Sequence, residues 1–141
     1  MLLCCQIIGE EMQKNKEGSI INIGSIYGMV SPDQRIYLKK DSEKKFRKPI
    51  AYCVSKSAVY NMTRYLATYF ASDGVRVNVL TFGGVFNNQD AEFVKNYCQK
   101  VPLNRMAKRD EYNGAVLFLA SNASSYMTGS NLVIDGGFTT W

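Results

Sequence analysis

Three short apolar segments, separated by longer stretches with helical spacing, constrain the fold of this 141-residue chain most strongly. The first, from Ile20 to Ile23, is rich in β-branched residues and lies between glycines, as is typical of a buried strand. Such alternation predicts an α/β fold, the terminal half of a doubly wound parallel sheet, in a single domain of residues 1–141. The expected order is helix 1–15, strand 19–24, loop 25–50, helix 51–72, strand 75–80, loop 81–89, helix 91–100, helix 108–120 and strand 132–134.

A tyrosine and a lysine at the start of helix 51–72 suggest acid–base chemistry. Tyr52 and Lys56 are four residues apart, so they share one face of a helix. A free phenol titrates near pH 10 (roughly), but a neighbouring cation stabilises the phenolate and lowers the pKa toward a catalytically useful range. No other tyrosine in the chain has a lysine four residues later. The same spacing arises by chance on solvated helices, so a catalytic role needs support from other residues.

A serine at the end of the first expected strand gives that support. Ser25 follows strand 19–24, and open α/β sheets bind their ligands at the carboxyl ends of their strands. A serine in this place can also simply cap or turn the chain. The combination of Ser25 with the Tyr52–Lys56 pair favours a catalytic interpretation.

Four separated motifs, in the same order, resemble those of the short-chain dehydrogenases/reductases. They are residues 21–28 (Ile-Asn-Ile-Gly-Ser-Ile-Tyr-Gly), 52–58 (Tyr-Cys-Val-Ser-Lys-Ser-Ala), 75–81 (Val-Arg-Val-Asn-Val-Leu-Thr) and 127–137 (Met-Thr-Gly-Ser-Asn-Leu-Val-Ile-Asp-Gly-Gly). The resemblance extends from about Met1 to the C-terminus. It implies a Rossmann-type fold and an oxidoreductase that uses NAD or NADP.

The resemblance also implies roles for particular residues. Tyr52 would be the general acid/base, while Lys56 would tune Tyr52 and bind the nicotinamide ribose. Ser25 would hydrogen-bond the carbonyl or hydroxyl of the substrate. The backbone at Gly83 and Val85 would approach the nicotinamide, in a segment where Phe82 replaces the proline usual in the family.

Other features of the family have no counterpart in the sequence. No G-x-G-x-x-G occurs, and the family's catalytic asparagine is absent. We therefore expect an N-terminally truncated domain that lacks the first βαβ units, with an incomplete dinucleotide site. Strand 19–24 would then lack one neighbour and present an apolar edge that invites pairing or aggregation.

The expected loop before helix 51–72 is unusually basic. Between Asp33 and Ile50 the local charge is +4 within a total of +5. One interpretation is attraction of an anionic substrate such as a sugar phosphate; the other is a solvated insertion. The wide gap from Ser25 to Tyr52, together with residues 26–28, 86–89 and 102–106, resembles the subgroup linked to flagellin glycosylation and nonulosonic acid pathways. That resemblance implies a phosphorylated or nucleotide-linked sugar as substrate. The charged residues are Arg35, Lys39, Lys40, Lys44, Lys45, Arg47 and Lys48, against Asp33, Asp41 and Glu43.

Composition excludes several other classes of protein. The chain has no histidine, which rules out a Ser-His-Asp or Cys-His hydrolase within it, and its four cysteines form no C-x-x-C pair, so we expect no metal site. Apolar runs are too short for a membrane span, which favours a cytoplasmic protein. Family likeness implies a homo-oligomer, a dimer or a tetramer.

Three functions remain open from the sequence. The favoured one is an NAD- or NADP-dependent oxidoreductase that transfers hydride to or from a carbonyl or alcohol carbon, with a sugar derivative as a candidate small-molecule substrate. The second is an inactive fragment of such an enzyme. The third is a basic module that binds a polyanion, although no recognised nucleic-acid fold accompanies the basic residues.

Overall fold

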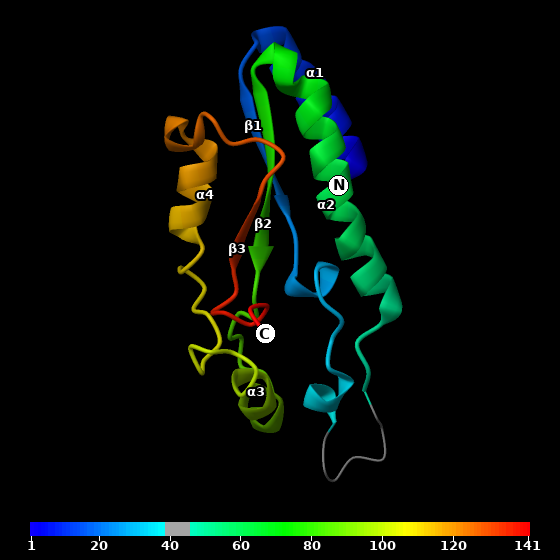
Figure 1. Cartoon of the computed structure of the whole chain (residues 1–141), viewed down its shortest axis with the longest axis vertical. Coiled ribbons are helices and arrows are strands. Elements are labelled where there is room, and N and C mark those ends of the chain that lie inside the picture. The colour runs from blue at the N-terminus through cyan, green and yellow to red at the C-terminus, as the bar shows by residue number, and fades with distance from the viewer. Residues whose placement is uncertain (39–45) are drawn as a thin grey trace.

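The computed structural model describes residues 1–38 and 46–141, and its centre is a parallel sheet (Figure 1). The described strands are β1 (Gly18–Ile23), β2 (Val75–Phe82) and β3 (Asn131–Ile134), in the order β1-β2-β3. Both pairings are parallel. The expected α/β architecture with a parallel sheet is therefore confirmed.

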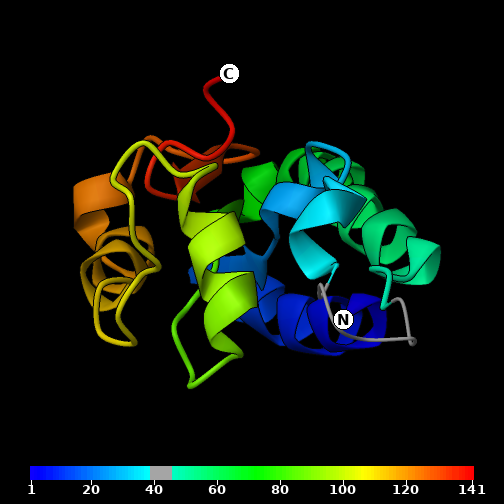
Figure 2. The same cartoon turned by 90° about the horizontal axis from the view of Figure 1, so that it is seen from below.

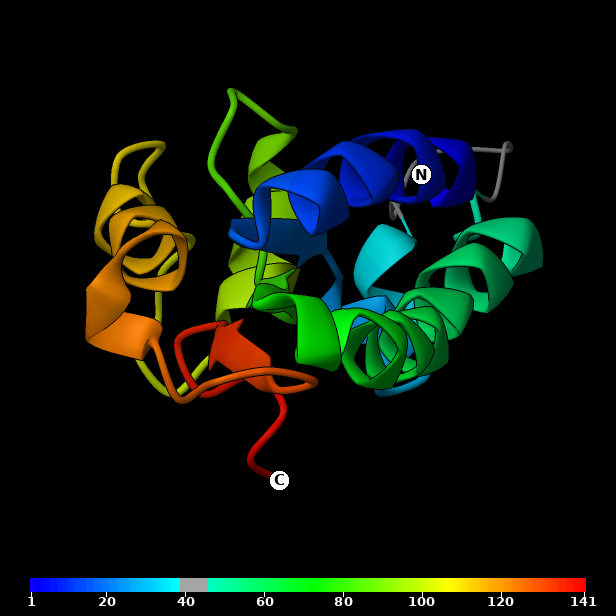
Figure 3. The ribbon, with the colours of Figure 1, turned by 90° about the horizontal axis from the view of Figure 1, so that it is seen from above.

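Helices cover the two faces of this sheet. Helix α1 (Leu2–Asn15) and the long helix α2 (Ile50–Phe70) pack on one face, and α4 (Asn113–Ala120) packs on the other (Figure 3). Helix α3 (Ala91–Cys98) lies beyond the ends of the strands (Figure 1). This is the doubly wound arrangement, and it leaves the carboxyl ends of the strands open to a ligand.

The central strand owes its position to its composition. Val75, Val77, Val79 and Leu80 are each at most 1% exposed, because helices cover β2 on both faces. Such continuous β-branched burial is typical of parallel sheets. On the α2 side, Phe70 contributes the largest fully buried side chain. The core therefore lies on both sides of β2.

The edge strand β1 is less well covered. Among the described strands it pairs with β2 alone, and most of its residues are only half-buried. A groove of about 540 Å³ runs beside it, lined by apolar residues of α1 and β1. Within the described residues, none of the helices combines the length and apolar character needed to cross a membrane.

Two expectations, for segments 25–50 and 108–120, were wrong. Segment 25–50 contains two short 3-10 helices, η1 (Ile26–Gly28) and η2 (Gln34–Tyr37), rather than loop throughout. The helix expected at 108–120 begins only at Asn113. The reason is Glu111, whose carboxylate accepts from the Lys108 amide at 2.7 Å and pairs with the guanidinium of Arg105 at 2.6 Å, which holds the preceding residues in turns.

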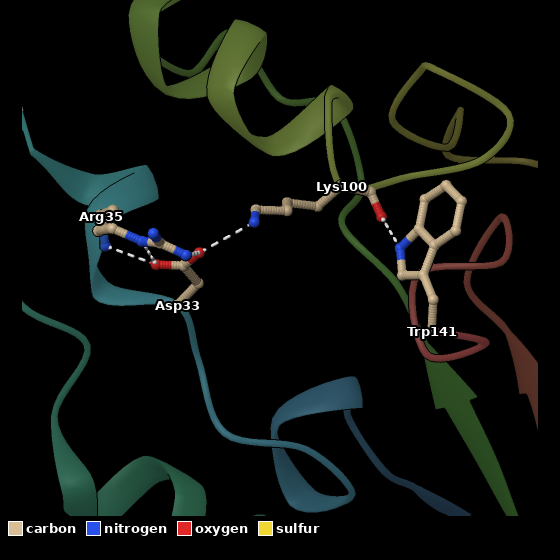
Figure 4. A network of polar contacts seen from close by, with 4 residues as sticks. All are labelled: Asp33, Arg35, Lys100 and Trp141. Atoms are coloured by element: carbon tan, nitrogen blue, oxygen red, sulfur yellow. Dashed lines mark hydrogen bonds and ion pairs between the residues drawn. The ribbon is translucent and has the colours of Figure 1, made fainter.

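Polar contacts hold η2 against the end of α3. Asp33 accepts hydrogen bonds from Arg35 and pairs with the Lys100 ammonium at 3.1 Å, while Trp141 Nε1 donates to the Lys100 carbonyl at 3.3 Å (Figure 4). The guanidinium of Arg35 holds the pKa of the Asp33 carboxyl well below its usual range. Figure 2 shows η2 and α3 side by side at this end of the molecule. These contacts fix the two segments whose aromatic side chains line the cavity described next.

Candidate active site

A cavity of about 220 Å³ lies beyond the carboxyl ends of β1 and β2. Parallel pairing sets its position, because Ile23 is opposite Leu80 and both strands therefore end at the same edge of the sheet. Its walls come from η1, η2, the start of α2, the segment after β2, and α3. The lining residues are Ser25, Ile26, Tyr27, Tyr37, Lys48, Tyr52, Phe82, Gly83, Gly84, Val85, Gln89, Phe93, Tyr97 and Met106.

Ser25 stands at the end of β1 and caps η1. Its Oγ accepts a hydrogen bond from the Tyr27 amide at 3.2 Å, and the residue is 6% exposed. The capping interpretation from the sequence is therefore correct as far as local structure goes. Ser25 also lines the cavity, so the two roles do not exclude each other.

Tyr52 and Lys56 lie in the first two turns of α2. Tyr52 is half-buried and lines the same cavity as Ser25. The Lys56 ammonium donates to the carbonyl of Ile23 at 2.9 Å, at the end of β1. The structure thus brings Ser25 and Tyr52 to one cavity and directs the Lys56 ammonium at the strand end beside it.

Residues 83–85, which follow β2, contribute mainly backbone to the wall of the cavity. Gly83 and Val85 line the cavity, together with Gly84. A Cβ on Gly84 would lie 2.7 Å from Tyr97 Cζ, so only glycine fits beneath that ring. Phe82, which stands where the family has proline, remains within β2, and its ring centre lies 4.0 Å from that of Tyr112.

Tyr60 is a site residue that our sequence reasoning missed. Its hydroxyl donates to the Ser25 carbonyl at 2.7 Å, accepts from the Ser25 amide at 3.3 Å, and lies 2.9 Å from Thr81 Oγ1. Thr81 Oγ1 in turn donates to Asn131 Oδ1 at 2.6 Å. One phenol therefore connects α2, the end of β1 and the central strand. The available signal was the spacing, since Tyr52, Lys56 and Tyr60 recur every fourth residue on one helical face.

Aromatic side chains form the outer walls of the cavity. The hydroxyls of Tyr27 and Tyr37 lie 3.1 Å apart, and the Tyr37 ring packs on Phe93 of α3 at 5.4 Å between centres. Burial raises the pKa of Tyr27 far above its usual value, and the neighbouring Tyr37 hydroxyl adds to this. Tyr27 is therefore a neutral wall residue rather than a proton carrier.

The structure describes only part of the basic segment between Asp33 and Ile50. Lys39, Lys40, Lys44 and Lys45, with Asp41 and Glu43, lie outside the described residues. Of those that are described, Arg35 pairs with Asp33, whereas Lys48 reaches the cavity, with its Nζ 4.0 Å from the centre of the Tyr52 ring. Whether the whole segment attracts anions stays a prediction.

Known proteins are similar to this chain along nearly its whole length. A family model described as enoyl-(acyl carrier protein) reductase matches residues 1–139. A sorbose reductase of Candida albicans is 34% identical over 140 residues, covering 96% of this chain and 46% of the relative. A galactitol 2-dehydrogenase of Rhizobium johnstonii is 35% identical over 144 residues, covering 98% of this chain and 51% of the relative.

Solved structures agree with the sequence relatives. A short chain dehydrogenase from Leptospira borgpetersenii, crystallised with bound NAD+, superposes with a TM-score of 0.87 at 41% identity, covering 97% of this chain and 51% of that one. A gluconate 5-dehydrogenase from Burkholderia cenocepacia, in complex with NADP and tartrate, gives a TM-score of 0.81 at 29% identity, with 97% and 51% coverage. The chain spans about half the length of the curated relatives it matches.

Proposed function

The chain belongs to the short-chain dehydrogenase/reductase family, and we propose that it supplies the catalytic residues of an NAD- or NADP-dependent oxidoreductase for polyols and the corresponding ketoses. One observation carries the proposal. Ser25, Tyr52 and the backbone of residues 83–85 line a single cavity at the carboxyl edge of the sheet, and the Lys56 ammonium reaches the end of β1 beside it.

The nicotinamide end of the cofactor fits the residues present. The 83–85 segment offers bare backbone to the cavity, because Gly83 and Gly84 leave no room for side chains: a Cβ would lie within 2.8 Å of Asp135 Cα or 2.7 Å of Tyr97 Cζ. Gly83, Val85, Tyr52 and Lys56 would hold the nicotinamide and its ribose. When bound, a nicotinamide supplies or accepts the hydride of the reaction.

Each side chain then has a defined task toward the substrate. Tyr52 gives a proton to the oxygen of a carbonyl substrate, or takes one from an alcohol, within hydrogen-bonding distance. The Ser25 hydroxyl hydrogen-bonds the same oxygen and fixes its direction. Lys56, one helical turn from Tyr52, holds its ammonium at the end of β1 beside the cavity, where it can bind the ribose of the nicotinamide.

Relatives suggest the substrate class. They include a sorbose reductase, a galactitol 2-dehydrogenase and D-arabinitol 2-dehydrogenases, all named for sugar alcohols or sugars. A cavity lined by several tyrosines suits a chain of hydroxyl groups, since phenols both donate and accept hydrogen bonds. The narrower likeness to flagellin-glycosylation oxidoreductases stays a prediction, as does a homo-oligomeric state.

Substitution of Tyr52 tests the assignment in the protein that carries this chain. With galactitol or D-arabinitol and either NAD or NADP, we expect Tyr52→Phe to lower kcat by about 100-fold or more, because the proton donor is lost. Tyr65→Phe, on the same helix but 65% exposed, is the matched control and should leave kcat unchanged. A Tyr52→Phe variant that keeps more than about a tenth of the turnover would mean that another group moves the proton.

The inactive-fragment alternative makes a different prediction. If this chain holds the dinucleotide only at its nicotinamide end, NAD(H) and NADP(H) should bind the 141-residue chain with dissociation constants weaker than about 1 mM. Isothermal titration calorimetry measures this directly. Micromolar binding would show that the chain holds the cofactor by itself.

A further inference from the structure

Lys48 introduces a positive charge into a cavity that is otherwise neutral among its described lining residues. The lining contains tyrosines, apolar side chains, glycines, Ser25 and Gln89, but neither a carboxylate nor a second cation. Resting on the function proposed above, we infer that the Lys48 ammonium binds a carboxylate at one end of the substrate. Within the polyol class proposed above, the preferred substrate is then one that carries a terminal carboxylate, a polyhydroxy acid.

The backbone of Lys48 is held in place by one side chain. Its amide donates to Gln34 Oε1 at 2.9 Å, and its carbonyl accepts from Gln34 Nε2 at 3.4 Å. Pro49 follows and leads directly into α2, which begins at Ile50. Gln34 therefore ties the Lys48 backbone to η2, and Pro49 connects it to α2.

The Lys48 side chain lies over the ring of Tyr52. Its Nζ lies 4.0 Å from the centre of the Tyr52 ring, so the charge sits on the aromatic face inside the cavity. A cation–π contact of this kind is weak at a partly exposed site. An ammonium satisfied by a ring alone retains unused donors, which suits a negatively charged group of the substrate.

No carboxylate of the described residues competes for this ammonium. Asp33, on the neighbouring segment, is already paired with Arg35 at 2.8 Å and with Lys100 at 3.1 Å. Within residues 1–38 and 46–141, the Lys48 ammonium makes no ion pair. Its charge is thus available to a ligand that enters the cavity.

Among the lining residues that the structure describes, the charge count favours a carboxylate over a phosphate. One ammonium balances the single negative charge of a carboxylate, whereas a phosphate monoester carries about −1.5 to −2 near pH 7 and is typically held by several cations or a helix N-terminus. The hydroxyls of Tyr27 and Tyr37 lie in the same wall and can hydrogen-bond the sugar hydroxyls. The Lys48 ammonium and these two hydroxyls together suit an open-chain sugar acid.

A pair of matched ligands tests the inference. D-Gluconate and sorbitol are open-chain six-carbon polyols of the same configuration that differ only in the carboxylate at C1, and their binding and oxidation are compared in wild type, Lys48→Gln and Lys48→Arg. We expect Lys48→Gln to weaken gluconate binding roughly 10- to 100-fold through a loss of charge-assisted hydrogen bonding, and Lys48→Arg to restore most of it. Sorbitol binding should change less than about twofold.

Controls separate this inference from the proposed function. Lys14→Gln removes the same charge from the exposed surface of α1, where Lys14 is 72% exposed, and should leave gluconate binding unchanged. Tyr52→Phe should abolish turnover yet retain Lys48-dependent gluconate binding measured by calorimetry. If wild type turns over no polyol but binds gluconate through Lys48, the proposed function fails and the carboxylate site stands.

Four results would overturn the carboxylate site. They are a wild type that fails to bind gluconate, equal gluconate binding in wild type and Lys48→Gln, tighter Lys48-dependent binding of sorbitol 6-phosphate than of gluconate, and an equal loss for both ligands with a displaced pH–rate profile. The last result would instead show that Lys48 acts on the ionisation of Tyr52.

Discussion

Replacing Tyr60 with phenylalanine would remove a single oxygen from the junction of α2, β1 and β2. That oxygen contacts the Ser25 carbonyl at 2.7 Å, the Ser25 amide at 3.3 Å and Thr81 Oγ1 at 2.9 Å. The ring would remain and fill the same space. The substitution therefore isolates the polar contacts from the packing.

The expected loss of stability follows from those contacts. A buried hydrogen bond contributes about 0.5–1.5 kcal/mol net, and a buried group left without its partner costs about 1–3 kcal/mol. Thr81 still donates to Asn131 at 2.6 Å and the Ser25 carbonyl still accepts from the Gly28 amide at 2.8 Å, so the Ser25 amide is the group that loses most. We expect Tyr60→Phe to lower the free energy of unfolding by about 1–3 kcal/mol.

Equilibrium unfolding in urea, followed by circular dichroism, measures this value through the shift in midpoint at constant slope. Tyr65→Phe is the matched control, because Tyr65 is 65% exposed on the same helix and should change stability by less than about 0.5 kcal/mol. If the two variants lose the same free energy, the Tyr60 hydroxyl does not hold the end of β1. In the active protein, Tyr60→Phe should also lower kcat, because Ser25 is then less well fixed.

Two further predictions concern packing and pH. Gly9→Ala should destabilise the fold by about 1–3 kcal/mol, because the added methyl would clash with the Phe70 ring. Gly114→Ala should instead stabilise α4 by about 0.5–1 kcal/mol, because nothing lies within 4 Å of the new methyl. Thermal unfolding of both variants measures the two shifts, and shifts of the same sign would refute the reasoning. The guanidinium of Arg105 lowers the pKa of Glu111 from 4.5 to about 2, so its stabilising effect is fully present above pH 4.5 and is lost as the pH falls through 2. As the pH falls from about 5 to about 2, the free energy of unfolding of Glu111→Gln should therefore decrease less than that of wild type. Urea unfolding at each pH measures both values.

The sequence was sufficient for features that depend on neighbouring residues. β-Branched runs between glycines located β1 and the start of β2, because buried parallel strands need such side chains on both faces. The four-residue spacing of Tyr52 and Lys56 fixed their common helical face. Ser25 was placed correctly at a strand end, because the position of a strand boundary follows from the chain itself.

Errors arose where the pairing of side chains, rather than helical periodicity, set the local structure. The start of α4 was expected five residues too early (108 against Asn113), because Glu111 pairs with Arg105 and accepts from the Lys108 amide instead of opening a helix. Helical periodicity reports only the face that a segment would bury. It carries no information on which carboxylate a nearby arginine will hold in a turn.

Only the tertiary structure decided which residues meet at the cavity. The parallel register of β1 and β2 brings Ser25 near the 83–85 backbone, and the packing of α2 on β2 carries the Tyr60 hydroxyl to Ser25. The placement of Lys48 over the Tyr52 ring depends on Gln34 of η2, whose side chain holds the Lys48 backbone. Such contacts join residues far apart in the chain, and their geometry is fixed by strand register and side-chain packing, neither of which is encoded in any short sequence motif.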